Sequence, residues 1–315
     1  MPRCRACPTR SSRSARACCP ARAPTCAPWP EQADPRMPTV VTRLLGGLGN
    51  QMFQYAAARA LSLYQGGRLL LDTAALAVPG GHTPRDYALD VFDIRAEVLG
   101  EGGLHGFNGM RVAESGPRFD ARVPRIEGDA YLAGYWQSER YFRGVRPVLQ
   151  RDFRLRRAPG SHARAWSDRI QAAQRAGRAT VSLHVRRGDY VSLPQAAAHH
   201  GACETDYYLQ ALAELQRRHG ELEVFAFSDD PAWVAANLRV DAPLHVVSDA
   251  AASAAHEDLW LMQQCRHHVI ANSSFSWWGA WLGHAPQATV IAPRQWVRTP
   301  GFDTRDVVPA DWVCL

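Results

Sequence analysis

The chain of 315 residues contains no lysine, so all 36 of its basic side chains are arginines. We interpret this absence, together with abundant alanine and glycine, as the compositional bias of a GC-rich, bacterial source and not as a binding signal. The sequence also lacks the run of roughly 18 apolar residues that a membrane-spanning helix needs. With 46% hydrophobic and 21% charged residues, it is typical of a globular protein large enough for two domains. We therefore expect no transmembrane segment.

Net positive charge is scarce outside residues 1–36. This tail holds seven arginines against Glu31 and Asp34, which accounts for +5 of the formal net charge of +6. A basic balance confined to a tail does not indicate nucleic acid as a partner. The tail has neither apolar periodicity nor the apolar stretch of a signal peptide. We expect it to be disordered or a spurious extension before a natural start at Met37, with a basic lipid anchor as the alternative.

Cysteines are few outside the tail, where only Cys203, Cys265 and Cys314 occur. Three scattered thiols fit reduced cysteines of a cytoplasmic protein better than a disulfide framework. Cys4 and Cys7 form a CxxC, but no second pair follows at zinc spacing, so we predict no metal site. The predicted location is cytoplasmic, and peripheral association with the inner face of a bacterial membrane is left open.

Strand and helix patterns alternate along most of the body. The segment Thr39–Leu45 reads as a strand, Gln51–Tyr64 as a helix and Arg68–Asp72 as a second strand, which together form a βαβ unit. Residues 73–130 are rich in loop signals. Further strands are expected at Val181–Val185, Glu223–Phe227, Leu244–Ser248, Val269–Ala271 and Thr289–Ala292, and helices at Ser161–Arg178, Thr205–His219 with Thr205 as N-cap, Pro231–Leu238, Glu257–Cys265 and Ser274–His284.

This alternation predicts an α/β protein with parallel sheets covered by helices on both faces. We expect two Rossmann-like domains facing a cleft, one spanning residues 37–160 and the other residues 161–315.

The motif HVRRGDY, His184–Tyr190, follows a predicted strand. Ligands of open α/β sheets lie beyond the carboxyl ends of the strands, and guanidinium groups bind phosphate oxygens in bidentate fashion. Because adjacent side chains on extended backbone diverge, we expect one of Arg186 and Arg187 to face a diphosphate and the other to pair with Asp189 or clamp the loop. The alternative is a surface turn with an Arg–Asp pair.

Two shorter motifs also follow predicted strands. The GGLGN run of residues 46–50 brings backbone N–H groups and a helix N-terminus toward an anion or a sugar, although a plain tight turn fits equally well. In FSDD, Phe227–Asp230, the carboxylates of Asp229 and Asp230 suit guanine or ribose. Either of them could instead cap the helix that begins near Pro231.

The segment ANSSFSWWGAWLG, Ala271–Gly283, places two serines, Ser273 and Ser274, at the start of a helix, where hydroxyl and N–H groups can hold phosphate. Three tryptophans follow within five positions. They would serve either in sugar stacking or, as we favour, in the buried core.

These motifs occur in the order seen in one family. The sequences GGLGNQMFQYA, GYWQSERYF, HVRRGDYV, FSDDP, HEDLWLMQQC and NSSFSWWGAWL, found between Thr39 and Trp296, resemble the bacterial α1,2-fucosyltransferases. The HxRR element also looks like the donor site that α1,6-fucosyltransferases and protein O-fucosyltransferases share. The resemblance implies a GT-B-type glycosyltransferase that uses GDP-β-L-fucose as co-substrate, inverts the anomeric centre and needs no cofactor or metal.

The resemblance also implies roles for individual residues. The donor-binding set is His184, Arg186, Arg187, Asp229, Asp230, Ser273, Ser274, Phe275, Gly47, Gly49, Asn50 and Gln51. The catalytic set is Arg186, Asp189 and Glu257. For the base that takes the acceptor proton, the candidates in falling order are Asp189, Glu257 and His256, and Asp189 fits a purely structural role equally well.

The implied acceptor is a β-galactoside in a glycan or lipopolysaccharide precursor. The resemblance also implies that the domain of residues 37–160 is the acceptor side and that residues 161–315 bind GDP-fucose. Residues 73–130 depart most from the family pattern, and acceptor choice could depend on them. The alternatives are a GDP-fucose transferase that makes another linkage or acts on protein, and a non-catalytic carbohydrate-binding module.

Overall fold

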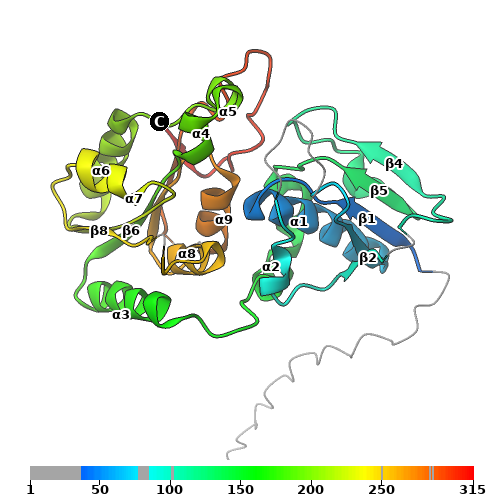
Figure 1. Ribbon diagram of the computed structural model, residues 1–315, viewed down its shortest axis with the longest axis horizontal. Coiled ribbons are helices and arrows are strands. Elements are labelled where there is room, and N and C mark those ends of the chain that lie inside the picture. The colour runs from blue at the N-terminus through cyan, green and yellow to red at the C-terminus, as the bar shows by residue number, and fades with distance from the viewer. Residues whose placement is uncertain (1–36, 77–84, 101–102, 250, 284, 286) are drawn as a thin grey trace, which may run out of the picture. The chain divides into compact units, whose positions relative to one another are not determined.

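The computed structural model describes residues 37–76, 85–100, 103–249, 251–283, 285 and 287–315. The basic tail, whose disorder the sequence predicts, lies outside these residues. The described part of the chain groups into one compact unit that holds two parallel sheets (Figure 1). The predicted domain boundary at residue 160 falls between the two sheets, just before the helix α3 (Ser161–Arg175), and stays a prediction.

The first sheet has five strands in the order β3-β2-β1-β5-β4, all parallel. Their bounds are β1 Thr39–Arg43, β2 Arg68–Asp72, β3 Glu97–Val98, β4 Met110–Ala113 and β5 Ala130–Ala133. Helix α1 (Leu48–Gln65) connects β1 to β2, which confirms the predicted βαβ unit. The helix begins three residues earlier than predicted, immediately after Gly47. Strands β3 and β4 lie in the region that reads as loops in the sequence.

The second sheet has six parallel strands in the order β11-β10-β9-β6-β7-β8. Their bounds are β6 Ala179–Val185, β7 Leu222–Ser228, β8 Leu244–Val246, β9 His267–Val269, β10 Val290–Ala292 and β11 Val313–Cys314. The other helices are α2 Arg146–Asp152, α4 Gly188–Ser192, α5 Pro194–His199, α6 Thr205–His219, α7 Pro231–Asn237, α8 Ala255–Met262 and α9 Ser274–Gly283. Short 3₁₀ turns occupy Leu89–Val91, Val123–Arg125, Glu139–Tyr141 and Arg143–Val145.

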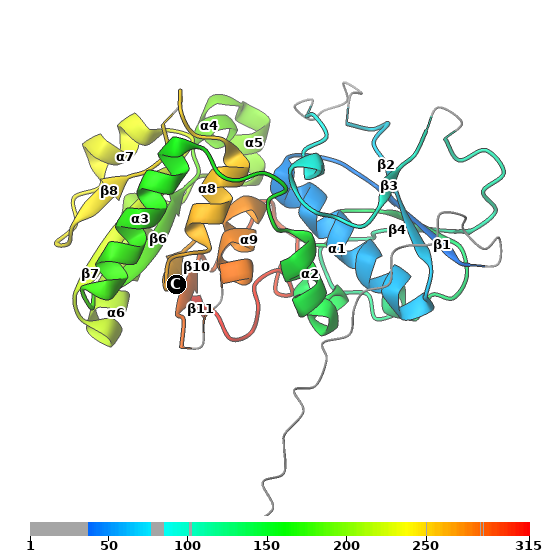
Figure 2. The same cartoon turned by 90° about the horizontal axis from the view of Figure 1, so that it is seen from below.

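The central strands of this sheet are buried on both faces. Along β6, Val181 and Leu183 belong to the apolar cluster that α6 covers, whereas Phe225 and Phe227 of β7 pack in the cluster on the α3 side. Figure 2 shows α3 and α6 flanking these strands. Because successive side chains of a strand point to opposite faces, a strand covered twice is apolar throughout. This is why the sequence predicted this half of the fold well.

Several predicted boundaries are wrong by a few residues. Thr205 is the first helical residue of α6 and not its N-cap; the N-cap is Glu204, whose side chain makes no capping hydrogen bond. Helix α3 ends at Arg175, ahead of Gly177, whose φ of +81° a helix cannot continue. The strand predicted at Val269–Ala271 is β9, two residues earlier, because the chain beyond Val269 turns toward α9. None of the described helices is long and apolar enough to cross a bilayer.

Helices α1 and α9 pack directly against each other, and a glycine sets their separation (Figure 1). A Cβ added at Gly49 of α1 would lie 2.5 Å from the carbonyl carbon of Ser274 and 2.5 Å from the backbone nitrogen of Phe275. The backbones therefore meet at a distance that only glycine allows. The indole Nε1 of Trp278 donates a hydrogen bond of 3.0 Å to the Gly49 carbonyl and fixes the contact.

An aromatic cluster surrounds this contact. Phe53 of α1 lies between two indoles of α9, with ring centroids 4.4 Å from Trp277 and 5.0 Å from Trp278. Phe142 stacks on Trp278 at 5.3 Å. Trp277, Trp278 and Trp281 are at most 2% exposed. The preference for buried core over sugar stacking is thereby confirmed, and these rings join the two halves in one apolar core.

We expect Gly49→Ala to lower the melting temperature by several degrees. The methyl group would meet backbone atoms on two sides, and overpacking of this kind costs about 1–3 kcal/mol, more than the gain in helix propensity of about 1 kcal/mol. Thermal unfolding followed by circular dichroism measures the effect. Gly116→Ala is the matched control, because a Cβ there meets nothing within 4 Å. An unchanged midpoint for Gly49→Ala would show that the contact is not a constraint.

Candidate functional site

The HVRRGDY and FSDD motifs leave the second sheet side by side. In the parallel register of β6 and β7, His184 is paired with Phe227 and Val185 with Ser228, so the polar residues beyond both strands emerge at the same edge. His184 itself is 5% exposed, and its ring packs 5.4 Å from the ring of Phe275. Burial, assisted by the charge of Arg186, lowers the pKa of His184 to about 3. The imidazole is therefore neutral at physiological pH.

Arg186 is held between two carboxylates. Its guanidinium nitrogens lie 2.5 Å from Oδ1 of Asp189 and 2.7 Å from Oδ2 of Asp229. Arg85 approaches Asp189 from the other side, at 3.6 Å. The sequence left open whether Asp189 forms an ion pair with one of the two arginines. In the structure it does, and its partner is Arg186, the arginine predicted to be catalytic. The two carboxylates fix the plane of the guanidinium and leave some of its five N–H donors free.

Arg187 turns toward the FSDD motif. Its backbone N–H donates to Oδ1 of Asp229 at 2.8 Å, and its Nε donates to Oδ2 of Asp230 at 3.2 Å. The guanidinium carbon lies 4.2 Å from the ring centre of Trp233. Stacking on the ring occupies the face of the group, so its in-plane N–H donors stay directed outward. The next residue, Gly188, has no room for a side chain, because a Cβ at this position would lie 2.4 Å from the Asp229 carboxylate.

Asp230 has a second task at the start of α7. Its Oδ1 accepts from the backbone N–H of Trp233 at 3.1 Å, so it is the N-cap of this helix. Its own N–H donates to the Ser228 hydroxyl at 2.9 Å. The capping alternative is confirmed for Asp230, while Asp229 binds the arginine segment. Contacts of either carboxylate with guanine or ribose stay a prediction.

The NSSF segment lies at the start of α9, next to the buried His184. Ser273 is 8% exposed, and neither its hydroxyl nor that of Ser274 hydrogen-bonds to any residue that the structure describes. Tyr190 of HVRRGDY donates to the Asn272 carbonyl at 3.2 Å and links the two motifs. The predicted phosphate-side residues and the two arginines thus come from neighbouring parts of one sheet edge.

Asn272 is an anchor to which sequence reasoning gave no role. Its buried amide Nδ2 donates to the carbonyls of His200, Gly201 and Trp296, at 3.1, 2.9 and 3.2 Å. These bonds tie the turn before α9 to the segment beyond α5. The only signal was the position of an asparagine directly after a buried strand, which is too common to be diagnostic.

The residues of GGLGN shape the turn from β1 into α1, and one of them contacts the other half. Gly46 has a φ of +73°, Gly47 is the N-cap of α1, and Gly49 makes the close contact with α9. The Asn50 Oδ1 accepts from Nε2 of Gln137 at 2.8 Å. Donor contacts of these residues stay a prediction.

Gln51 is fully buried, and its side chain is committed to backbone groups. Its amide nitrogen donates to the carbonyls of Gly46 and Asp86, each at 2.9 Å, and its Oε1 accepts from the N–H of Ala88 at 2.9 Å. These three bonds hold the segment after residue 84 against α1. Contact of this side chain with the donor stays a prediction.

Glu257 lies apart from the arginines. Its Oε1 accepts from the Gly160 N–H at 2.6 Å, and it makes no contact with HVRRGDY among the described residues. The neighbouring Asp258 is the carboxylate that points toward the FSDD turn: the Ser248 hydroxyl donates to its Oδ2 at 2.6 Å and accepts from the N–H of Ser228. Burial raises the pKa of Asp258. The predicted role of Glu257 as proton acceptor is not supported by its position.

The charges of the site balance. Three arginines, Arg85, Arg186 and Arg187, face the carboxylates of Asp189, Asp229 and Asp230. Within the described ranges, no group of three or more His, Cys, Asp or Glu side chains is arranged to hold a metal ion. The arrangement suits recognition of an anion by guanidinium groups and helix N–H groups at a strand edge.

Comparison with known proteins places these features in a family. The model of glycosyl transferase family 11 matches residues 122–315. An α-1,2-colitosyltransferase of Escherichia coli is 33% identical over 297 residues, which cover 88% of this chain and 99% of the relative. The galactoside 2-α-L-fucosyltransferase Sec1 of Mus musculus is 25% identical over 84% of this chain and 69% of its own.

A solved structure supports the fold. The fucosyltransferase FUT1 of Arabidopsis thaliana, a mutant in complex with GDP, superimposes with a TM-score of 0.50 at 10% identity, covering 82% of this chain and 71% of the plant protein. At this identity the likeness shows the architecture alone. From the family match and the two parallel α/β halves together, the chain belongs to glycosyl transferase family 11 and has a GT-B-type fold.

Proposed function

We propose that the protein transfers L-fucose from GDP-β-L-fucose to the 2-hydroxyl of a terminal β-galactoside in a glycan or lipopolysaccharide precursor, with inversion at the fucose C1. The observation that carries the proposal is the shared edge at which β6, β7 and α9 bring the twin arginines, the FSDD turn and the NSSF helix start together. The names of the two relatives add support, because the E. coli protein is called an α-1,2-transferase and the mouse protein a galactoside 2-α-L-fucosyltransferase.

In this reaction the bond between the fucose C1 and the diphosphate breaks while the acceptor oxygen attacks the opposite face. Negative charge then grows on the departing diphosphate. The N-terminus of α9 and the Arg186 guanidinium are suited to stabilise that charge, because both are oriented before the reaction and need not reorganise. Asp189 and Asp229 hold Arg186 in place. The acceptor hydroxyl gives its proton to a base, for which Asp189 stays the first candidate.

A second donor is favoured by one specific observation. The E. coli relative, 99% of whose length aligns with 88% of this chain, is named a colitosyltransferase. Colitose is the 3-deoxy form of L-fucose, so one donor hydroxyl separates the two sugars. A site that hydrogen-bonds this hydroxyl would prefer fucose strongly, whereas an apolar contact there would not.

Donor and linkage are tested in one experiment. The purified protein is incubated with GDP-fucose or GDP-colitose and a panel of β-galactosides, and the products are analysed by NMR. We expect an α1,2-linked fucosyl galactoside. Transfer from GDP-colitose alone would favour the second donor, and a different linkage or a protein acceptor would contradict the α1,2 assignment. Binding of GDP-fucose without turnover on any acceptor would indicate a non-catalytic module.

We expect Arg186→Ala to lower kcat more than it raises the KM for GDP-fucose, because the lost donor acts on charge that develops in the transition state. The loss should be about 3–4 kcal/mol, or roughly a hundred- to thousandfold in rate. Arg186→Lys should recover only part of it, because a point charge lacks the planar fork. Steady-state kinetics, with folding checked by circular dichroism, gives the answer.

Arg187→Ala and Arg187→Lys are measured alongside. If Arg187→Ala lowers kcat more than Arg186→Ala does, Arg187 is the arginine that stabilises the departing diphosphate. If both alanine variants are folded and keep near-normal turnover, the diphosphate binds elsewhere and the assignment of HVRRGDY fails.

We expect activity to survive EDTA. With two arginines and a helix N-terminus available for the leaving diphosphate, a divalent cation is not needed for charge stabilisation. Initial rates are compared before and after chelation, with Mg²⁺ or Mn²⁺ added back. Loss of activity that either cation restores would contradict this expectation.

A further inference from the structure

The carboxyl edge of the five-stranded sheet lies beyond the ends of β1, β5 and β4. The chain runs from β1 through α1 to β2 on one side, whereas β5 and β4 lie on the other side of β1. Strand order therefore reverses between β1 and β5. In open α/β sheets, the point beyond the carboxyl ends of two such strands is where ligands bind.

Arg43 is the last residue of β1, at this switch point. Its guanidinium makes no hydrogen bond and no ion pair with any residue in the described ranges, and its Nε is shielded from solvent. The carboxylate of Asp72, its register partner on β2, is bonded instead by the Tyr131 hydroxyl at 2.7 Å. A half-buried cation without a partner is costly unless an oxygen-bearing ligand meets it.

Glu114 is the first residue beyond β4 at the same edge. Its Oε2 accepts from the Tyr135 N–H at 2.6 Å, and its Oε1 accepts from the Trp136 N–H at 2.9 Å. Gly134 allows this, because a Cβ there would lie 2.3 Å from the Glu114 Cβ. Two main-chain donors thus fix the orientation of the carboxylate. Each oxygen keeps a lone pair that can accept a further hydrogen bond.

Tyr135 lies two residues beyond β5, and its backbone N–H is one of the two donors to the Glu114 carboxylate. Burial and the Glu114 carboxylate raise the pKa of its phenol, while the Arg43 guanidinium lowers it. The phenol is therefore close enough to both groups to sense their charge. Three strand ends thus contribute to one cluster: β1 supplies the guanidinium of Arg43, β4 the carboxylate of Glu114 and β5 the phenol of Tyr135.

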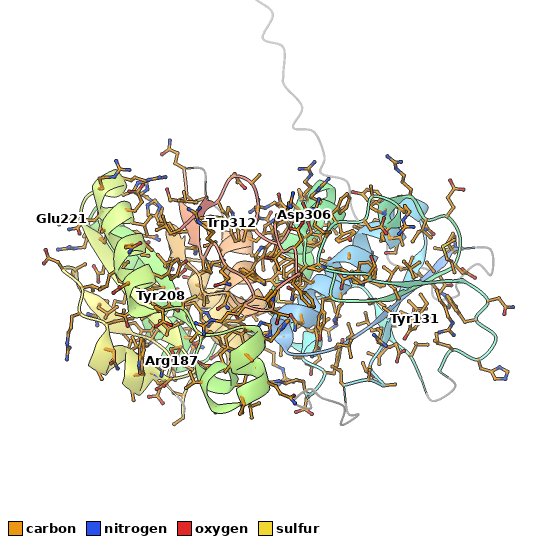
Figure 3. The ribbon with its side chains drawn as sticks, turned by 90° about the horizontal axis from the view of Figure 1, so that it is seen from above. Tyr131, Arg187, Tyr208, Glu221, Asp306 and Trp312 are labelled. Carbon is orange, nitrogen blue, oxygen red and sulfur yellow. The ribbon has the colours of Figure 1, made fainter. Side chains whose placement is uncertain are left out.

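The cluster connects to the donor motifs through a short series of contacts. Gln137, two residues beyond Tyr135, donates to Asn50, the neighbour of Gly49. Gly49 packs on the start of α9, where the ring of Phe275 faces His184. Among the residues that Figure 3 labels, Tyr131 lies in the five-stranded sheet and Arg187 lies beyond the six-stranded sheet.

We propose that Arg43, Glu114 and Tyr135 form the subsite for the acceptor sugar and bind it through its hydroxyl groups. A sugar hydroxyl can donate to the Glu114 carboxylate and accept from the Arg43 guanidinium, so neighbouring hydroxyls match both. Two carboxylates, Glu114 and Asp72, are matched by two guanidinium groups, Arg43 and Arg111, the latter 5.1 Å from the ring centre of Tyr131. A cluster with balanced charges suits a neutral sugar. The assignment rests on the proposed function for the identity of that sugar, a β-galactoside.

The central variant is Arg43→Gln, because the Arg43 guanidinium makes no hydrogen bond or ion pair within the described ranges, so we expect the fold to tolerate its loss. Tyr135→Phe removes one hydroxyl, and Glu114→Gln removes the charge. The matched controls Arg125→Gln and Glu127→Gln change exposed residues before the amino end of β5, the opposite edge of the sheet. Binding of lactose in the presence of GDP is measured by isothermal titration calorimetry, and binding of GDP alone is measured in parallel.

We expect Arg43→Gln and Glu114→Gln each to weaken lactose binding at least tenfold, with a smaller loss for Tyr135→Phe. These magnitudes follow from hydrogen bonds to charged groups, which contribute about 1.5–3 kcal/mol. GDP affinity and the melting temperature should stay at wild-type values for Arg43→Gln, and both controls should bind lactose normally.

Two outcomes would overturn the subsite: lactose affinity unchanged in Arg43→Gln and Glu114→Gln, or no binding of any β-galactoside by the wild-type protein with GDP. Failure of the proposed function would look different. If the wild type binds lactose through these residues but transfers no fucose to it, the subsite stands and the fucosyltransferase assignment falls.

Discussion

The close approach of α1 and α9 is the constraint on which the rest of the structure depends. The Gly49 backbone touches the Ser274–Phe275 peptide, and the Trp278 indole donates to the Gly49 carbonyl, so main-chain atoms of the two halves are in direct contact. Side-chain packing alone would fix the distance between the two helices less tightly. Around this contact the aromatic cluster excludes water and strengthens the hydrogen bond that it encloses.

The position of the candidate donor site follows from this contact. The first residues of α9 have one side against α1 and the other against His184, whose neutral ring packs on Phe275. The serine hydroxyls at the helix start are thereby set beside the end of β6, from which the arginines emerge. Within the Gly-rich segment, Gly49 sets the spacing of the two helices, and contact of this segment with the donor stays a prediction.

Much of the fold could be predicted because buried parallel strands leave a clear apolar pattern. The exceptions have physical reasons: β4 is largely exposed and β3 and β11 are two residues long, so none carries a run of core residues. The motifs of the site were also visible. Which carboxylate pairs with which arginine was not, because it depends on the register of β6 and β7. The partner of Gly49 was equally hidden, since Trp278 lies 229 positions away in the sequence.

The same contact limits how the molecule can move. A hinge rotation that separated the halves would have to part main-chain atoms, break the bond to the indole and expose the stacked rings to water. Rearrangement is easier where α4 passes into α5, because Val191 of α4 and Leu193, which lies between the two helices, are about half exposed. Entry and exit of a nucleotide sugar would then depend on local motion of this segment over a rigid two-lobed frame.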